Sequence, residues 1–145
     1  MNDQSMFAAI MGFFALYFVV LFAVIIAIIV ANWKIFTKAG EGGWKSIIPY
    51  YNMYILYKIS WKTSFFWILL ACLFGGGILS ALGGFLTIIG FIVAIVGCVI
   101  SVIQLHKLSK AFGHGVGFTI GLVFLNPIFL LILGFGSSQY LGPQM

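Results

Sequence analysis

The chain has 145 residues, of which 63% are hydrophobic and only 6% are charged, and its mean hydropathy is +1.23. Soluble domains carry about 25% charged residues, so this composition excludes a water-soluble globule and indicates an integral membrane protein. The seven basic residues are all lysines, against two acids, Asp3 and Glu41. We expect no nucleic-acid partner, because no clustered basic, aromatic-interleaved soluble face is present.

The first apolar run covers residues 6–31. Its helix would be roughly 39 Å long, enough to cross a hydrocarbon core of about 30 Å with some tilt. A secretory signal is not expected, because the run is too long and no basic segment precedes it. A shorter apolar stretch, rich in tyrosine, lies between Lys45 and Lys58, within a candidate segment over residues 47–60. This segment predicts an interfacial or re-entrant helix that begins around Pro49.

Residues 63–105 contain no charge, and a single helix of that length would be about twice as long as the membrane is thick. The stretch therefore predicts a hairpin of two spans, 63–79 and 85–105, with its turn where glycine is densest, between Gly75 and Gly84. A polar loop follows, and residues 115–135 predict a fourth span. The expected fold class is all-α: one polytopic membrane domain over residues 1–145, with four transmembrane helices and the interfacial helix.

The lysines predict the orientation of these spans. Two sets of them lie in the first and third loops: Lys34, Lys38, Lys45, Lys58 and Lys62, then Lys107 and Lys110. With four spans, both loops share one face, and the positive-inside rule makes that face cytoplasmic. Both termini are then expected outside the cytoplasmic (inner) membrane.

Two groups of motifs resemble a known family. The first is Trp33–Gly40 followed by Gly43–Asn52, and the second is Leu108–Gly113, Gly117-Phe118 and Ile132–Gly136. Together they resemble a small bacterial family of four-helix membrane proteins of unknown function, some members of which are labelled signal peptidase I. The resemblance implies the fold and a bacterial origin. It implies no catalytic or binding residues.

No catalytic, cofactor or metal site is expected. Signal-peptidase chemistry needs a serine, a lysine base and a β-domain outside the membrane, whereas all lysines here are expected on the cytoplasmic side. Paired-carboxylate chemistry needs two acids at one site, but the topology separates Asp3 from Glu41. His106 and His114 have no cysteine or acid beside them to complete the three or four ligands of a zinc site. We expect both to be solvated loop residues.

The candidate contact residues are of two kinds. Lys34, Lys38, Lys45, Lys58 and Lys62 are candidate contacts for anionic lipid or a protein partner, although topogenic bias alone also explains them. Gly113, Gly117 and Gly121 recur at intervals of four, a spacing that allows close helix packing within the monomer or in a homo-oligomer.

Asn126 and Pro127 are the most unusual pair in the expected fourth span. Pro127 predicts a kink. The Asn126 side chain is expected to bond the freed backbone, or to reach Ser101 or Thr87 on the third span. A gate or ligand contact is the functional alternative.

The leading functional hypothesis is a non-enzymatic membrane subunit or assembly module that packs with itself or with partner membrane proteins. The alternative is a small channel, carrier or lipid-handling protein, although spans without ionisable residues argue against proton coupling. An enzyme of the signal-peptidase type comes third and is disfavoured.

Overall fold

The computed structural model describes residues 2–145, and this range is helical without strands. The elements are α1 (Asp3–Lys38), the short 3₁₀ helix η1 (Gly43–Ser46), α2 (Tyr51–Ser60), α3 (Thr63–Leu82), α4 (Phe85–Ala111), α5 (Val116–Phe124) and α6 (Asn126–Phe135). The all-α class is confirmed. Among the described residues, three helices, α1, α3 and α4, are long and apolar enough to cross a membrane.

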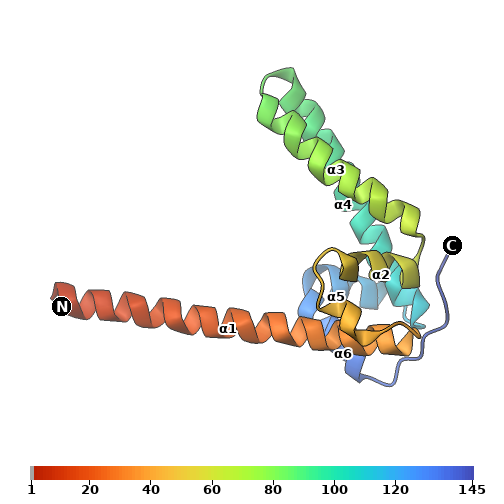
Figure 1. The fold of residues 1–145 in the computed structure, drawn as a ribbon, viewed down its shortest axis with the longest axis horizontal. Coiled ribbons are helices and arrows are strands. Elements are labelled where there is room, and N and C mark those ends of the chain that lie inside the picture. Colours follow the sequence, from red (N-terminus) through yellow and green to blue (C-terminus); the bar gives the residue numbers. More distant parts are fainter. Residues whose placement is uncertain (1) are drawn as a thin grey trace.

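Two arms extend from a common base (Figure 1). One arm is α1 alone, and the other is the antiparallel pair α3–α4. The base consists of η1, α2, α5, α6, the C-terminal tail (residues 136–145), and the last turns of α1 and α4. Every residue of α1 from 3 to 26 is exposed, so the chain buries α1 only at its C-terminal end.

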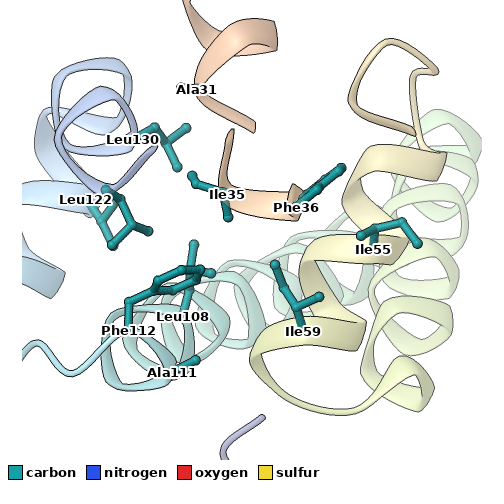
Figure 2. Close-up of a cluster of buried hydrophobic side chains, with 11 residues drawn as sticks. Ala31, Ile35, Phe36, Ile55, Ile59, Leu108, Ala111, Phe112, Leu122 and Leu130 are labelled. Atoms are coloured by element: carbon teal, nitrogen blue, oxygen red, sulfur yellow. The ribbon is translucent and has the colours of Figure 1, made fainter. Parts of the chain in front are cut away.

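The main hydrophobic core lies in the base. Phe36 of α1 points toward Ile55 of α2, whereas Ile35 points toward Leu130 of α6 (Figure 2). The other buried members of this core are Ala31, Ile59, Leu108, Ala111, Phe112, Leu122 and Leu133. Truncating a side chain of this kind costs about 2–5 kcal/mol. The base is therefore the part of the chain held together by its own packing.

The α3–α4 hairpin turns at Gly83 and Gly84, whose φ angles of +77° and +60° favour glycine. A Cβ atom added at Gly90 would lie 2.7 Å from the carbonyl oxygen of Gly76, so these glycines let the two helices approach closely. The hairpin predicted for residues 63–105 is present, but its turn is shorter than expected. Helix α3 continues through Gly75–Gly77 to Leu82, and α4 extends to Ala111, beyond the predicted end at residue 105.

The prediction of one continuous span over residues 115–135 is corrected by the structure. The chain breaks at Leu125 (φ −124°, ψ 47°) and α6 folds back along α5. The rings of Phe118 and Phe129 are 5.0 Å apart. His114 Nε2 and Ser138 Oγ, at the two open ends of the pair, are 2.6 Å apart. Helices α5 and α6 therefore form a hairpin, each about 13–15 Å long.

The sequence around Asn126 and Pro127 explains the break. Pro127 has no N–H and clashes with the preceding turn, but it is tolerated in the first turn of a new helix, where it lies in α6. The Asn126 Nδ2 donates to the carbonyl oxygen of Leu122 at 3.1 Å, so the expected bond to the freed backbone is present. Gly121 leaves room for the ring of Phe129. The result is a reversal of the chain rather than the predicted kink.

The C-terminal tail lies against α2 and α4. The Leu141 amide donates to the Ala111 carbonyl at 2.7 Å, and the Gln144 amide donates to the Ser60 carbonyl at 2.9 Å. The Tyr140 hydroxyl donates to the Ile59 carbonyl at 2.7 Å. The tail thus lies at the same end as the lysines. Helix α6 returns the chain to the base, whereas the four-span arrangement expects the tail on the opposite side of the membrane from the lysines; the side of each terminus stays a prediction.

Candidate functional site

The ammonium group of Lys38 caps helix α6. Its Nζ donates to the carbonyl oxygens of Leu133 and Gly136, both at 2.7 Å. The last carbonyls of a helix have no partner within it and are commonly satisfied by a basic side chain. Gly134, between these two residues, packs so closely on α1 that an added Cβ would lie 2.8 Å from the Ala31 carbonyl oxygen. Lys38 therefore has a structural role at the junction of α1 and α6.

Glu41 binds two of the other candidate lysines. Its two carboxylate oxygens each lie 2.5 Å from an ammonium group, that of Lys45 and that of Lys58. The hydrogen bonds from Lys45 and then Lys58 lower the pKa of the Glu41 carboxyl.

The five candidate lysines thus divide into two groups. Lys38, Lys45 and Lys58 hold segments of the base together, while Lys34 and Lys62 form no hydrogen bond or ion pair within residues 2–145. Their contact with lipid or a partner stays a prediction.

An open aromatic groove of about 570 Å³ lies between α2 and the start of α3. Its lining residues are Tyr50, Tyr51, Tyr54, Phe66, Trp67 and Leu70. The Tyr51 and Tyr54 rings stack at 6.0 Å, and Tyr54 meets Phe66 edge-on at 5.5 Å. The sequence indicated an interfacial or re-entrant segment rich in tyrosine but did not reveal the groove. The one sequence feature that could have indicated the groove is the concentration of aromatic residues on both sides of Trp61-Lys62, the short link between α2 and α3.

Tyr50 has a strained backbone at the edge of this groove. Its φ of 62° is the only positive value at a non-glycine residue within residues 2–145. With ψ at −42° and a 2.7 Å hydrogen bond from the Tyr51 amide to the Pro49 carbonyl, it forms a γ-turn of the rare strained type. Strain of this kind persists only where the surrounding structure enforces it, and it clusters at functional sites.

The tip of the α5–α6 hairpin is exposed. Phe124 is 79% exposed and Leu125, at the break itself, is 51% exposed. Of the three glycines at intervals of four, only Gly117 and Gly121 lie on α5, and their packing in a homo-oligomer stays a prediction. Gly113 has a φ of +79° and lies in the turn after α4, and nothing lies within 4 Å of a Cβ added at Gly117. Only Gly121 makes a close contact, with the ring of Phe129.

The two histidines connect elements of the base, and both are half-buried; His114 lies in the loop between α4 and α5, whereas His106 does not lie in a loop. His106 lies in α4, where its Nδ1 is 2.9 Å from the hydroxyl of Thr119 on α5. The His114 ring stacks on Phe118 at 4.1 Å, and its Nε2 bonds Ser138. Across residues 2–145, no three His, Cys, Asp or Glu side chains gather closely enough to hold a metal ion.

Comparison with known proteins gives a family but no described activity. No curated protein and no solved structure matches the chain. A family model described as a family of unknown function, DUF5684, matches residues 44–143, from η1 to the C-terminal tail. Three of the motif segments noted in the sequence lie inside this range: Leu108–Gly113, Gly117-Phe118 and Ile132–Gly136. The segment Gly43–Asn52 lies inside it except for its first residue, and Trp33–Gly40 lies outside it. The match extends over more than half of the sequence, and the chain belongs to this family of unknown function.

Proposed function

We propose that the chain is an integral protein of a bacterial cytoplasmic membrane, with α1, α3 and α4 as its spans. The base, apart from its α5–α6 hairpin, then lies at the cytoplasmic face, because all seven lysines belong to it or to its edges. With three spans, the N-terminus is outside and the C-terminal tail is cytoplasmic. Helices α5 and α6 form a re-entrant hairpin that enters the membrane from the cytoplasmic side and returns to it.

Within this membrane, we propose that the protein is a non-enzymatic assembly subunit that packs with another copy or with a partner membrane protein. The observation that carries this proposal is the exposed hairpin tip. One helix length, about 13 Å, from the open end of the α5–α6 hairpin, the break at Leu125 then lies near the middle of a hydrocarbon core about 30 Å thick. Non-helical backbone at that depth is tolerated only where protein buries it or where it lines a water-filled cavity. Within the chain, Phe124 and Leu125 have no such cover.

The long arm α1 supports the same proposal. Its outer part, residues 2–26, packs on no other part of the chain. Association of helices in lipid depends on close packing and on hydrogen bonds between them, and α1 makes such contacts only through its last turns. A neighbouring protein that covers the hairpin tip would lie beside α1, because α6 packs along that helix.

Photocrosslinking in native membranes tests the proposal. The photoreactive amino acid benzoylphenylalanine would replace Phe124 at the tip or, as a control, the exposed Phe74 on α3. We expect the probe at 124 to form a protein adduct of defined mass and the probe at 74 to label lipid. Adducts with lipid alone at both positions would contradict an assembly role.

The channel alternative makes a different prediction at the same tip. A cysteine at Leu125, with Cys72 and Cys98 changed to serine, would line water in a pore and react with a polar thiol reagent. In the assembly proposal, this cysteine is buried by protein and stays unreactive. An enzyme of the signal-peptidase type is disfavoured, because the lysines needed as a base lie on the cytoplasmic side in the proposed topology.

A further inference from the structure

The aromatic groove between α2 and α3 combines an apolar wall with free hydrogen-bond donors. Phe66, Trp67 and Leu70 belong to the first two turns of α3, a helix long and apolar enough to cross a membrane. The opposite wall is the start of α2, with the phenols of Tyr50, Tyr51 and Tyr54. None of these three hydroxyls makes a hydrogen bond within residues 2–145. One side therefore suits a hydrocarbon chain and the other suits hydrogen-bond acceptors.

The size and position of the groove restrict its occupant. Its volume of about 570 Å³ lies within the range of about 300–1,000 Å³ that is typical of small-molecule sites. In the proposed topology, α2 lies along the cytoplasmic surface and α3 descends from it, so the groove is the corner between them. A molecule in this corner has one part at headgroup depth and another in the hydrocarbon. Tyrosine is the residue expected at such a boundary.

The charges around the groove favour an anion. Lys58 follows Tyr54 by four residues on α2, and Lys62 precedes Phe66 by four residues at the start of α3. On the third side, Trp44 lies 6.4 Å from Tyr51, and Lys45 is the next residue in η1. The single nearby acid is Glu41, which pairs with Lys45 and Lys58. Three lysines against one carboxylate leave the rim positive.

We propose that this groove binds one anionic phospholipid. Its acyl chain lies along Phe66, Trp67 and Leu70. The tyrosine hydroxyls donate hydrogen bonds to its phosphate and ester oxygens. The proposal rests on the membrane topology above but not on an assembly role. The γ-turn at Tyr50 then has a purpose, because it holds an exposed phenol at the rim of the groove at the expense of backbone strain.

Quenching of Trp67 by brominated lipid tests the site. The full chain, with Trp33, Trp44 and Trp61 changed to phenylalanine, would be reconstituted in phosphatidylcholine vesicles containing phosphatidylglycerol brominated on its acyl chains. The control is the double variant W67F/I68W, which moves the tryptophan to an exposed neighbour at the same depth that does not line the groove. We expect Trp67 to report a local anionic-lipid concentration about tenfold above the bulk, or 1.4 kcal/mol. The control should follow the bulk concentration.

Two further variants separate binding from structure. Changing Tyr50, Tyr51 and Tyr54 together to phenylalanine keeps the rings, removes the hydroxyls and should abolish the preference for the anionic lipid. Tyr50→Gly relieves the strained φ, so it should raise thermal stability while lowering that preference. A purely structural role of Tyr50 predicts no change in lipid preference.

Three other outcomes of the quenching experiment would overturn the proposal, each for a different reason. Equal quenching at the two tryptophan positions would mean that the groove holds only bulk lipid. Quenching of the control without quenching of Trp67 would mean that protein fills the groove. An absence of quenching at both positions would contradict the proposed membrane topology, and the proposed lipid site would be rejected together with it. An intact quenching pattern without the crosslink at Phe124 would leave the lipid site standing and reject only the assembly role.

Discussion

Lys38, the last residue of α1, donates a 2.7 Å hydrogen bond to the carbonyl oxygen of Leu133, which lies 95 residues later in the chain. The same ammonium group also bonds the Gly136 carbonyl at the end of α6. Both bonds join a charged donor to carbonyls that the helix cannot satisfy itself. The C-terminal ends of α1 and α6 are thereby fixed to each other.

Replacing Lys38 by methionine should destabilise the base. A hydrogen bond to a charged group contributes about 1.5–3 kcal/mol, and methionine keeps much of the apolar stem while removing the donor. We expect the unfolding free energy in mild detergent to fall by about 2 kcal/mol. Lys62→Met is the matched control, because Lys62 is exposed and bonds nothing in the described chain. Equal effects of the two substitutions would show that the cap contributes nothing.

The ion pairs of Glu41 should make the base sensitive to acid. Because the hydrogen bonds from Lys45 and Lys58 hold the Glu41 pKa below its usual 4.5, folding favours the ionised carboxylate. The resulting stabilisation is complete above the usual pKa and is lost as the pH falls through the lowered value. Unfolding midpoints measured across this pH range should decrease for the natural chain. Glu41→Gln should lower stability at neutral pH and flatten this decrease, and an unchanged acid profile in that variant would rule out Glu41 as its source.

Cysteine labelling should report three spans and a re-entrant hairpin. Ser5, Lys110 and Gln139 would each be changed to cysteine in a chain without Cys72 and Cys98. In intact cells, an impermeant thiol reagent should label position 5 only. Positions 110 and 139 should react together once the membrane is permeabilised. Labelling of position 139 in intact cells would contradict the three-span arrangement and support four spans with the C-terminus outside.

Two glycines of the α3–α4 hairpin should respond oppositely to alanine. At Gly90, an added Cβ would approach the backbone of Gly76 and the hydroxyl of Ser80. Gly90→Ala should therefore cost about 1–3 kcal/mol as an overpacked contact. At Gly77, which is helical, nothing lies within 4 Å, so alanine should stabilise the helix by up to about 1 kcal/mol. Thermal unfolding of the two variants, side by side, checks the difference in sign.

Much of the secondary structure could be predicted from local signals. The apolar runs predict the long helices, and the glycine-rich segment predicts the hairpin turn near Gly83. Asn126 and Pro127 predict a disturbance and a bond to the freed backbone, as observed. The reversal at Leu125 could not be predicted in the same way. Hydropathy measures how apolar residues 115–135 are, and it carries no information on the direction of the chain.

In the candidate site too, some contacts could be predicted from the sequence and others could not. The pair of Glu41 and Lys45 is separated by four residues and could be found from the sequence alone. The partner of Lys38 is a backbone carbonyl on a distant helix, for which no sequence pattern exists. The aromatic groove depends on the angle between α2 and α3 at Trp61-Lys62, and this angle is set by tertiary packing. Counting lysines and tyrosines therefore identified the residues but not their roles.

The distance along the chain between Lys38 and its acceptors also constrains how the protein is made. Proteins are synthesised from the N-terminus at about 5–20 residues per second. Helix α1 therefore emerges well before Leu133 and Gly136 exist. During that interval, Phe36 has no α4 or α6 to pack against, and the carbonyls that Lys38 bonds have not been synthesised. The base can close only when the final helix has been added, so translation that stops before α6 should leave α1 without its anchor and open to capture by insertion or quality-control factors.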